Sequence, residues 1–290
     1  MILITGASGT AGGAVLLEVL KRGAPVRAMY RSKEDAAKAP QGANAVIADF
    51  ADPQSLQRAL EGVSTVFLVC SPVRELVQLE SNMIDACKQS GVKHILLNSA
   101  LGAGDFPKSF PSWHRQVEDK LRASGIGYTI FRPNGFMQNF LMYFAPSIRT
   151  QGAFYQSIGD AKISHVDVRD VGLAASHVLL SPAAHAGKIY EPCGPEALSY
   201  EQLAEKISKA TGRTVKYVDI LPEAQRKSLL DLGMPEWQVT ALLDLQEYYA
   251  CGECAKTDGV LQSLMGHAPM TIDRFLAEFA DGFHEQAAKA

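Results

Sequence analysis

The chain begins with Met1-Ile2-Leu3-Ile4-Thr5-Gly6-Ala7-Ser8-Gly9-Thr10-Ala11-Gly12, an apolar run that breaks into glycines and then enters a helical pattern of apolar residues. This order predicts a buried strand, a tight turn and a helix. Gly6 permits a sharp turn, Gly9 leaves room for a pyrophosphate, and Gly12 lets the helix pack close to the strand. Because the amides at a helix N-terminus attract anions, the stretch predicts a dinucleotide-binding turn.

The glycine spacing is GxxGxxG rather than the usual GxGxxG, because Ser8 stands where the middle glycine would be. Glycines at a strand-to-helix turn can serve packing alone, so the spacing by itself is a weak signal. Its position in the first strand-turn-helix unit favours the cofactor interpretation. The residues that we expect to contact the cofactor here are Gly6, Ser8, Gly9, Thr10, Ala11 and Gly12.

The end of the second predicted strand indicates which dinucleotide is bound. Enzymes that use NAD place an acidic residue there, about 20 residues past the turn, on the ribose 2'-hydroxyl. This chain has Arg31 instead, whose guanidinium can donate two hydrogen bonds to a 2'-phosphate. The alternative is that Arg31 is a solvated surface arginine. The position favours NADP(H), with NADPH bound in preference to NADH.

Length and charge limit the class of protein. A chain of 290 residues with 47% hydrophobic content can form one large domain or two unequal ones. A net charge of -3 without long runs of like charge gives no support for nucleic-acid binding. No apolar run approaches the ~18 residues of a membrane span, and the first strand leaves no room for a signal peptide. We therefore expect a cytoplasmic protein that binds neither nucleic acid nor membrane; its oligomeric state is left open.

The five cysteines do not form a framework. Their number is odd and they are scattered, which is not typical of a disulfide scaffold. Only Cys251 and Cys254 have a chemical spacing, CxxC, but a structural zinc site normally needs a second pair. We expect no metal site, and the role of this pair is left open.

Strands and helices alternate along the first 133 residues, which is typical of an α/β fold. Further strands are expected at 45–49, 65–70, 94–99 and 128–132, with helices at 52–60, 76–89 and 111–124. Crossover helices of this length predict a Rossmann fold, a doubly wound parallel sheet with strand order 3-2-1-4-5-6. Ligands of such sheets bind at the carboxyl ends of the strands, which nominates Asp49, Phe50, Ser71, Ser99, Asn134, Gly135 and Phe136.

Two of these residues have simpler alternatives. Asp49 is placed to accept the adenine amino group, with Phe50 near the ring, but it can instead cap a loop. Ser99 can merely satisfy backbone groups.

Beyond residue 134 the composition becomes aromatic, and we expect a smaller, discontinuous substrate-binding domain. The Rossmann domain is predicted to span 1–133, with 164–192 returning to it. This return is expected through a strand at 163–171 that leads into a helix up to Leu180, followed by a strand at 188–192. The substrate domain would span 134–163 and 193–290, with a helix at 198–210 and a helical lid at 222–249 split at 233–235. Its aromatic run is either core or pocket wall, and the predicted pocket residues are Phe136, Met137, Phe140, Trp237 and Tyr248.

Several segments together resemble a known family. They are 5–12, Arg31, Asp49, Trp113-His114-Arg115-Gln116-Val117-Glu118 and Tyr128-Thr129-Ile130-Phe131-Arg132-Pro133-Asn134, which resemble the NmrA-like, atypical branch of the short-chain dehydrogenase/reductase superfamily. The tail from Gly233 to Thr257 looks most like the triphenylmethane reductase group, beside the quinone and azo reductases. The resemblance implies NADP(H) as cofactor and reduction of dyes, quinones or azo compounds, or cofactor sensing without catalysis.

One departure from the superfamily shapes the expected mechanism. Typical members use a Tyr with a Lys four residues later as proton donor, and none of the nine tyrosines here has that lysine. His114 and Glu118 have this spacing instead, and they either orient nicotinamide and substrate or form a plain surface pair. With His114 and Ser99 in orienting roles, we predict a reductase that transfers hydride from NADPH to a flat, conjugated acceptor. The alternative is an NADP(H) sensor that regulates a partner protein.

Overall fold

The computed structural model describes residues 1–284 and divides the chain into two compact units. The first unit comprises Met1–Pro133, Val168–Pro192 and Val260–Gly266. The second comprises Asn134–Asp167, Cys193–Gly259 and His267–Ala290. The chain therefore leaves the first unit and returns to it twice, and residues 260–266, which the sequence had assigned to the smaller domain, belong to the first unit.

A seven-stranded parallel sheet forms the centre of the first unit, in the order β3-β2-β1-β4-β5-β6-β8. The predicted order 3-2-1-4-5-6 and the fold class are confirmed, and β8 extends the sheet at one edge. The strands are β1 (Ile2–Ile4), β2 (Val26–Tyr30), β3 (Asn44–Ile47), β4 (Thr65–Leu68), β5 (His94–Asn98), β6 (Gly127–Phe131) and β8 (Ile189–Tyr190).

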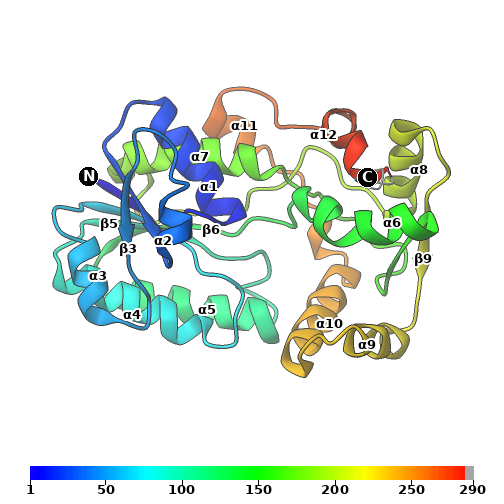
Figure 1. Cartoon of the computed structure of the whole chain (residues 1–290), viewed down its shortest axis with the longest axis horizontal. Coiled ribbons are helices and arrows are strands. Elements are labelled where there is room, and N and C mark those ends of the chain that lie inside the picture. Colours follow the sequence, from blue (N-terminus) through cyan, green and yellow to red (C-terminus); the bar gives the residue numbers. More distant parts are fainter. Residues whose placement is uncertain (285–290) are drawn as a thin grey trace. The chain divides into compact units, whose positions relative to one another are not determined.

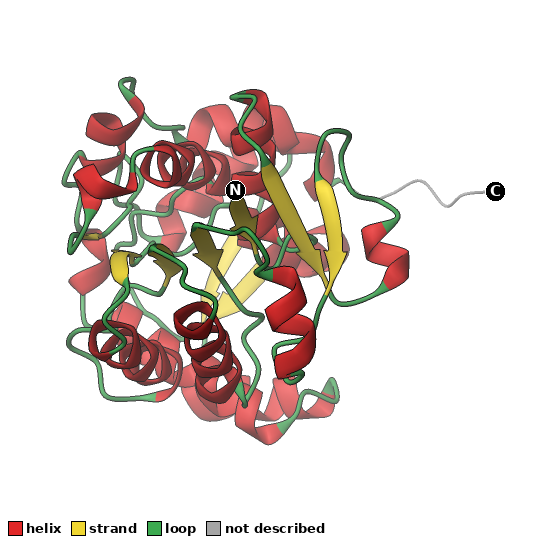
Figure 2. Ribbon diagram, turned by 90° about the vertical axis from the view of Figure 1, so that its left-hand side faces the viewer, coloured by secondary structure: helices red, strands yellow, loops and turns green. Residues whose placement is uncertain are grey.

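Helices cover both faces of this sheet (Figures 1 and 2). α1 packs against α7 on one face, whereas α3, α4 and α5 pack side by side on the other. The helical segments of this unit are α1 (Thr10–Lys21), α2 (Lys33–Ala36), α3 (Pro53–Ala59), α4 (Leu76–Gln89), α5 (Ser109–Ala123), α7 (Val168–Leu180), the 3-10 turn η2 (Pro182–His185) and α11 (Val260–Met265). The predicted helix at 76–89 is confirmed, and α3 begins as expected, with the Asp52 side chain accepting a hydrogen bond from the amide of Gln54.

The central strands form because their residues are apolar on both faces. Every residue of β1, β4 and β5 is buried, as a strand covered by helices on both sides requires. Helices α1 and α7, which cover one face of the sheet, approach each other closely. A Cβ added at Gly172 of α7 would lie only 2.8 Å from the backbone carbon of Ala14 in α1. The absence of a side chain at Gly172 therefore sets the spacing of these two helices.

The apolar stripe of α4 contains one carboxyl group. Leu76, Met83, Ile84 and Cys87 pack in the core, and Glu80 lies on the same stripe with none of its surface exposed. Within residues 1–284 neither carboxyl oxygen of Glu80 has a hydrogen-bond partner. Burial disfavours the charged form and raises the pKa of Glu80 to about 8.

The second unit has a small parallel sheet of two strands, β7 and β9, which the sequence did not predict. The predicted helix at 198–210 is confirmed as α8, and the segment at 222–249 splits into α9 and α10 as expected. Its elements are the π-helix η1 (Phe140–Phe144), α6 (Ala145–Gln151), β7 (Ala153–Gln156), α8 (Tyr200–Thr211), β9 (Lys216–Asp219), α9 (Pro222–Asp231), α10 (Glu236–Ala250), the 3-10 turn η3 (Glu253–Ala255), α12 (Ile272–Phe279) and the 3-10 turn η4 (Ala280–Phe283).

The core of the second unit is aromatic. Phe144 stacks on Phe154 with 4.6 Å between ring centroids and meets Tyr200 edge-on at 5.3 Å. Phe140 stacks on Phe144 at 5.8 Å and meets Phe275 edge-on at 6.2 Å. Stacked and edge-to-face pairs are arrangements that aromatic rings prefer, so Phe140 and Phe144 of the aromatic run at 136–144 form core, whereas Met142 and Tyr143 are exposed.

The helix predicted to end at Leu180 is confirmed as α7, but the strand predicted before it at 163–171 is wrong. In its place the chain makes two isolated bridges, Phe136 to Val166 and Ile163 to Leu198, and α7 begins at Val168. The bridge between Phe136 and Val166 is parallel, whereas the bridge between Ile163 and Leu198 is antiparallel. The segment therefore does not pair continuously with one neighbouring strand. Alternating apolar residues at 163–171 reflect burial of a loop rather than strand pairing.

We predict that Glu80 makes the stability of the protein depend on pH. Because its pKa in the folded state, about 8, lies above its ordinary value, the folded state binds this proton more tightly than the unfolded state does. Stability should therefore be full below the ordinary pKa and fall as pH rises towards 8. Glu80→Gln should remove this slope, which is worth up to about 5 kcal/mol for a shift of this size.

Urea denaturation at a series of pH values from 5 to 9 measures the effect. The matched control is Glu75→Gln, because Glu75 precedes the same helix but is exposed. Parallel pH profiles for wild type and Glu80→Gln would contradict the assignment.

Candidate functional site

The glycine turn between β1 and α1 is held rigidly. Gly6 adopts a φ of 56°, which favours glycine, and its carbonyl accepts a hydrogen bond of 2.8 Å from the amide of Gly9. The hydroxyl of Thr5 accepts from the amide of Val69 at 2.8 Å and lies 2.9 Å from the carbonyl of the same residue. The turn is thereby tied to the carboxyl end of β4, the neighbouring strand in the sheet.

The start of α1 offers backbone amides to an anion. Its N-cap residue, Gly9, provides no side-chain hydrogen bond, and Gly6, Ser8, Gly9 and Thr10 are all exposed. The first amides of a helix have no partner within the helix, so here they face outward without a cap. A Cβ at Gly12 would lie 2.1 Å from the carbonyl oxygen of Gly6, so only glycine allows this packing. The turn therefore fits the diphosphate of a dinucleotide.

Arg31 follows β2 and is exposed. Over the described residues, 1–284, no hydrogen bond or ion pair engages its guanidinium, whereas its neighbour Ser32 caps α2 by accepting from the amide of Asp35 at 3.1 Å. The guanidinium is therefore available for a phosphate beside the glycine turn. This is the arrangement that the NADP(H) interpretation requires.

Asp49 and Phe50 follow β3. One carboxylate oxygen of Asp49 accepts a hydrogen bond of 2.8 Å from the amide of Ala51, so the loop-capping role exists, and the side chain stays exposed. Phe50 is half-buried against the core, and its carbonyl accepts from the Asn82 side chain at 3.0 Å. Contact of Asp49 and Phe50 with adenine remains a prediction. The carboxylate of Asp49 is exposed and could still accept a hydrogen bond from the adenine amino group.

The loop after β4 contains Ser71, which is exposed, and Cys70, which is half-buried. Burial, assisted by the nearby carboxyl group of Glu80, raises the pKa of the Cys70 thiol to about 12. The thiol therefore stays protonated at neutral pH and cannot act as a thiolate nucleophile.

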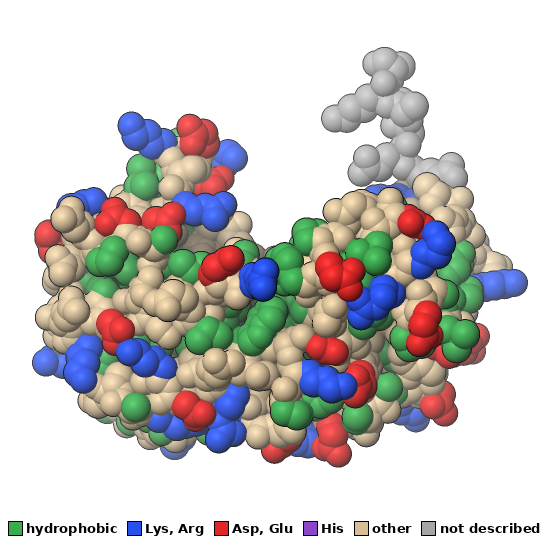
Figure 3. Space-filling model, turned by 90° about the horizontal axis from the view of Figure 1, so that it is seen from below, with side chains coloured by type: hydrophobic (Ala, Val, Ile, Leu, Met, Phe, Trp, Pro, Cys, Tyr) green, Lys and Arg blue, Asp and Glu red, His purple; other side chains and the backbone are tan. Residues whose placement is uncertain are grey.

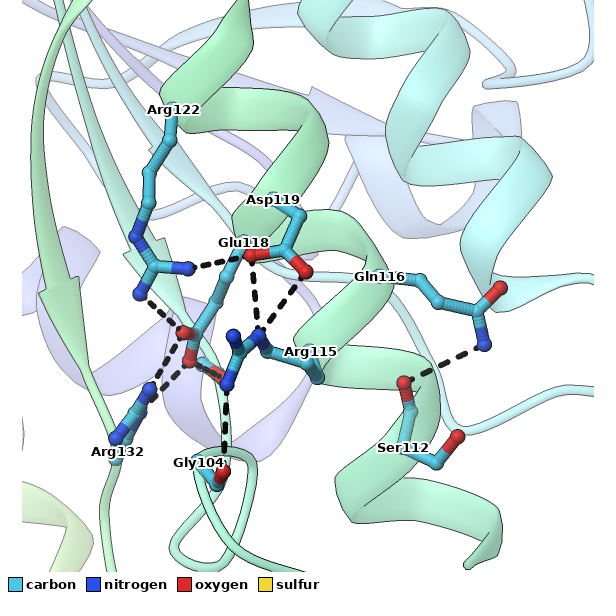
Figure 4. A network of polar contacts seen from close by, with 9 residues as sticks. Gly104, Ser112, Arg115, Gln116, Glu118, Asp119, Arg122 and Arg132 are labelled. Atoms are coloured by element: carbon cyan, nitrogen blue, oxygen red, sulfur yellow. Dashed lines mark hydrogen bonds and ion pairs between the residues drawn. The ribbon is translucent and has the colours of Figure 1, made fainter. Parts of the chain in front are cut away.

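A charged network lies behind the carboxyl end of β5, and Figure 4 shows most of it. Glu118 of α5 is fully buried and binds three side chains. The Ser99 hydroxyl donates to its Oε1 at 2.7 Å, Arg132 donates to both oxygens at 2.8 and 2.7 Å, and Arg122 donates to Oε2 at 2.7 Å. Strand β5, helix α5 and the end of β6 are thus joined through one carboxylate.

This network keeps Glu118 ionised. Burial alone would raise the pKa of Glu118, but the hydrogen bonds from Arg132 and Ser99 and the charge of Arg132 outweigh it and lower the pKa below its usual value. Arg132 is held in turn by Glu191, 3.6 Å away. The sequence did not reveal that Arg132 and Arg122 bind Glu118. Arg132 is distant from Glu118 along the chain, and the spacing of Arg122 from Glu118 on one helix is also that of an ordinary surface pair.

His114 lies one turn before Glu118 on α5. Burial lowers the pKa of His114 to about 4, although the charge of Glu118 opposes this shift, so the imidazole is neutral at pH 7. Its Nδ1 atom is buried and has no hydrogen-bond partner among residues 1–284. The surface-pair alternative for His114 and Glu118 is wrong, because Glu118 is completely buried and bound by other side chains.

The residues that follow β6 belong to the second unit and are committed to its loops. The side-chain amide of Asn134 donates to Ser164 Oγ at 3.0 Å and to the carbonyl of Cys254 at 2.8 Å, while its oxygen accepts from the amide of Gly135. The carbonyl of Gly135 lies 3.0 Å from Nδ1 of His165, a buried histidine that the sequence did not single out.

The predicted pocket residues differ in burial. Met137 and Phe140 are completely buried and Tyr248 is nearly so, which places all three in the core of the second unit. Phe136 and Trp237 keep partial exposure and are the two that can still contribute to a pocket. The aromatic and apolar side chains of Met137, Phe140 and Tyr248 instead pack in the core.

Residues 1–284 hold no group of three or more His, Cys, Asp or Glu side chains arranged to bind a metal ion. All five cysteines are free; Cys251 is exposed and Cys254 is buried. Within the same described range, no helix combines the length and the apolar character needed to cross a membrane.

The parallel sheet, the glycine turn and the uncapped helix define a dinucleotide-binding protein of the Rossmann class. More specifically, the chain belongs to the NmrA-like family, whose model matches residues 1–277. The resemblance stated from the sequence is thus confirmed.

Known relatives span the chain almost completely. An NAD(P)H azoreductase of Xenophilus azovorans is 35% identical, with 98% of this chain and 99% of the relative covered. Among solved structures, the NADPH-dependent quinone oxidoreductase of Escherichia coli complexed with NADPH has a TM-score of 0.88 and 32% identity, covering 96% of this chain and 99% of that one. The triphenylmethane reductase of Citrobacter sp. complexed with NADP(H) has a TM-score of 0.85 and 27% identity, covering 97% and 100%.

We predict that Arg31 determines the preference for NADPH over NADH. Arg31→Ala should weaken NADPH binding about 10- to 100-fold, because a hydrogen bond to a charged group is worth roughly 1.5–3 kcal/mol. NADH, which has no 2'-phosphate, should bind the variant and wild type alike. Titration of both nucleotides, with Arg74→Ala as an exposed control, measures the ratio. An unchanged preference would remove Arg31 from the site.

Proposed function

We propose that the protein is an NADPH-dependent reductase that transfers hydride to a conjugated acceptor, such as an azo compound, a quinone or a triphenylmethane dye. Support comes from the exposed glycine turn, from the unpaired guanidinium of Arg31 and from relatives that are named reductases. The observation that carries the choice of acceptor is the Glu118 network, in which the Ser99 proton is already donated and the nearby His114 is neutral.

Neither Ser99 nor His114 is placed to act as a general acid at pH 7. The single proton of the Ser99 hydroxyl is donated to Glu118, and His114 is neutral at pH 7. When bound, NADPH supplies the hydride. A simple ketone that accepts hydride becomes a basic alkoxide, whose protonation by a positioned acid contributes about 10²- to 10⁴-fold. A triarylmethyl cation needs no proton, and a quinone or azo group spreads its new charge until water protonates it.

We further propose which residues hold the two ligands. The cofactor would contact the glycine turn, Arg31, Asp49, Phe50, Ser71 and the segment 134–136. Ser99 and His114 would orient rather than protonate, while Phe136 and Trp237 would face the acceptor.

Cytoplasmic localisation and the absence of nucleic-acid partners are part of the same proposal. On the face drawn in Figure 3, acidic and basic side chains are interspersed without a large patch of one sign. Phosphate backbones are bound by clusters of lysine and arginine, and this face provides none.

A second candidate function is cofactor sensing without catalysis. It is favoured by the burial of Met137, Phe140 and Tyr248, which leaves fewer apolar side chains for an acceptor pocket. A sensor needs only the cofactor site, and a test with acceptors distinguishes the two functions.

We predict turnover with conjugated acceptors and negligible turnover with a simple aliphatic ketone. NADPH consumption is measured with a cationic triarylmethane dye, an azo dye, a quinone and the ketone. His114→Ala should lose only a few-fold in rate with the dye, because no proton is needed there. Efficient ketone reduction would contradict the mechanism, and tight NADPH binding without turnover of any acceptor would favour the sensor.

We predict that Trp237 contributes to acceptor binding and not to cofactor binding. Trp237→Ala should raise the KM for the dye about 5- to 10-fold or more, because loss of aromatic contact costs roughly 1–2 kcal/mol, and leave the Kd for NADPH unchanged. Tyr143→Ala, which removes an aromatic ring with 60% of its surface exposed, is the control. Wild-type values for both constants would make Trp237 ordinary packing.

A further inference from the structure

The hydrogen bonds around Glu118 have only one possible direction. An ionised carboxylate accepts hydrogen bonds at about four positions and donates none. Four donor atoms surround Glu118: Ser99 Oγ and Arg132 Nε on Oε1, and Nη2 of both Arg132 and Arg122 on Oε2. With none of its surface exposed and its pKa lowered, Glu118 is a saturated acceptor.

This saturation decides what Ser99 can offer to a ligand. A serine hydroxyl has one proton and two lone pairs, and here the proton is donated to Glu118 at 2.7 Å. The backbone amide of Ser99 is also occupied, because it donates to the carbonyl of Phe131 at 2.7 Å. The side chain of Ser99 therefore has only hydroxyl lone pairs left to offer, and the residue has no free donor. Ser99 is nearly buried, with 3% of its surface exposed, directly after the carboxyl end of β5.

We propose that Ser99 is an obligate hydrogen-bond acceptor that recognises the carboxamide N–H of the nicotinamide, and that Glu118 is the positioning residue that sets this polarity. The inference rests on the proposed binding of NADP(H). In a doubly wound sheet the half built from β4, β5 and β6 receives the second nucleoside of the dinucleotide, here the nicotinamide. The carboxamide is the group of the nicotinamide ring that carries N–H donors. Quinone and azo acceptors offer mainly lone pairs, which Ser99 cannot satisfy.

Arg132 and Arg122 maintain this polarity. If Glu118 were protonated, it could donate to Ser99 and release the hydroxyl proton towards the ligand. The two guanidinium groups stabilise the charged form of Glu118 and so prevent the reversal. Gly104 lies against Arg132, because a Cβ there would be 2.9 Å from its Nη1 atom.

The test compares NADPH with the reduced 3-acetylpyridine analogue, in which a methyl ketone replaces the carboxamide and no N–H remains. Binding is followed by fluorescence titration without any acceptor, so activity is not the readout. Wild type should prefer NADPH about 3- to 10-fold, the range of one hydrogen bond. Ser99→Ala should bring the ratio close to one, and Ser99→Thr, which keeps the hydroxyl, should retain it.

Glu118→Gln should also lower the ratio, because Ser99 is then free to donate to the methyl ketone. Asp119→Asn is its control: Asp119 shares Arg122 with Glu118 but is exposed and does not bind Ser99. Since Glu118→Gln disturbs two guanidinium groups, the two Ser99 variants carry the test if that variant does not fold.

Adenosine 2',5'-bisphosphate, which has the 2'-phosphate but no nicotinamide, separates the two levels of the argument. If it fails to bind wild type, the proposed cofactor site is wrong. If it binds wild type and Ser99→Ala equally, while Ser99→Ala loses the NADPH preference that wild type shows, the inference is supported. A preference in wild type that survives Ser99→Ala, or the lack of any preference in wild type, would overturn the role of Ser99.

Discussion

The first unit depends on one steric constraint, the contact between the start of α1 and the turn that precedes it. A methyl group at Gly12 would overlap the carbonyl of Gly6, and one at Gly6 would meet the side chain of Val69 at 2.9 Å. Without these two side chains, α1 can lie directly against the end of β1 with its amides exposed. The exposed amides that can bind phosphate therefore result from the close packing of α1 on the turn. The other predicted site residues follow the neighbouring strands of the same sheet.

Two buried glutamates show how the same environment gives opposite electrostatic outcomes. Glu80 and Glu118 are both fully buried, on adjacent helices that cover one face of the sheet. Among the residues that the structure describes, no donor reaches Glu80 at hydrogen-bonding geometry, and the nearby backbone of Cys70 opposes burial too weakly to keep its pKa from rising. Glu118 has four donors and its pKa is lowered. Burial penalises both charges, and only matched donors reverse the sign. We therefore expect the free energy of unfolding to depend on pH through Glu80, whereas Glu118 stays ionised and keeps its hydrogen bonds.

Sequence reasoning succeeded where the signal was local. The apolar run before Gly6, the Asp52-Pro53 start of α3 and the break at 233–235 each encode their element within a few residues. It failed where the partner was distant: Ala153 pairs with Lys216 in the second sheet, and Glu118 meets Arg132 across a helix and a strand. The aromatic run was ambiguous because core and pocket walls share a composition. Burial in the folded chain, which composition does not reveal, placed Phe140 in the core.

The close packing of α1 against α7 has a consequence for synthesis of the chain. α1 is made well before the helix that covers it, which spans Val168–Leu180, and the edge strand β8 follows later still. During translation the apolar side of α1 must remain without its final neighbour while residues 134–167, which belong to the other unit, leave the ribosome. The amino-terminal unit thus cannot complete its folding co-translationally in sequence order, and exposed apolar surface on the nascent chain is a natural target for chaperones.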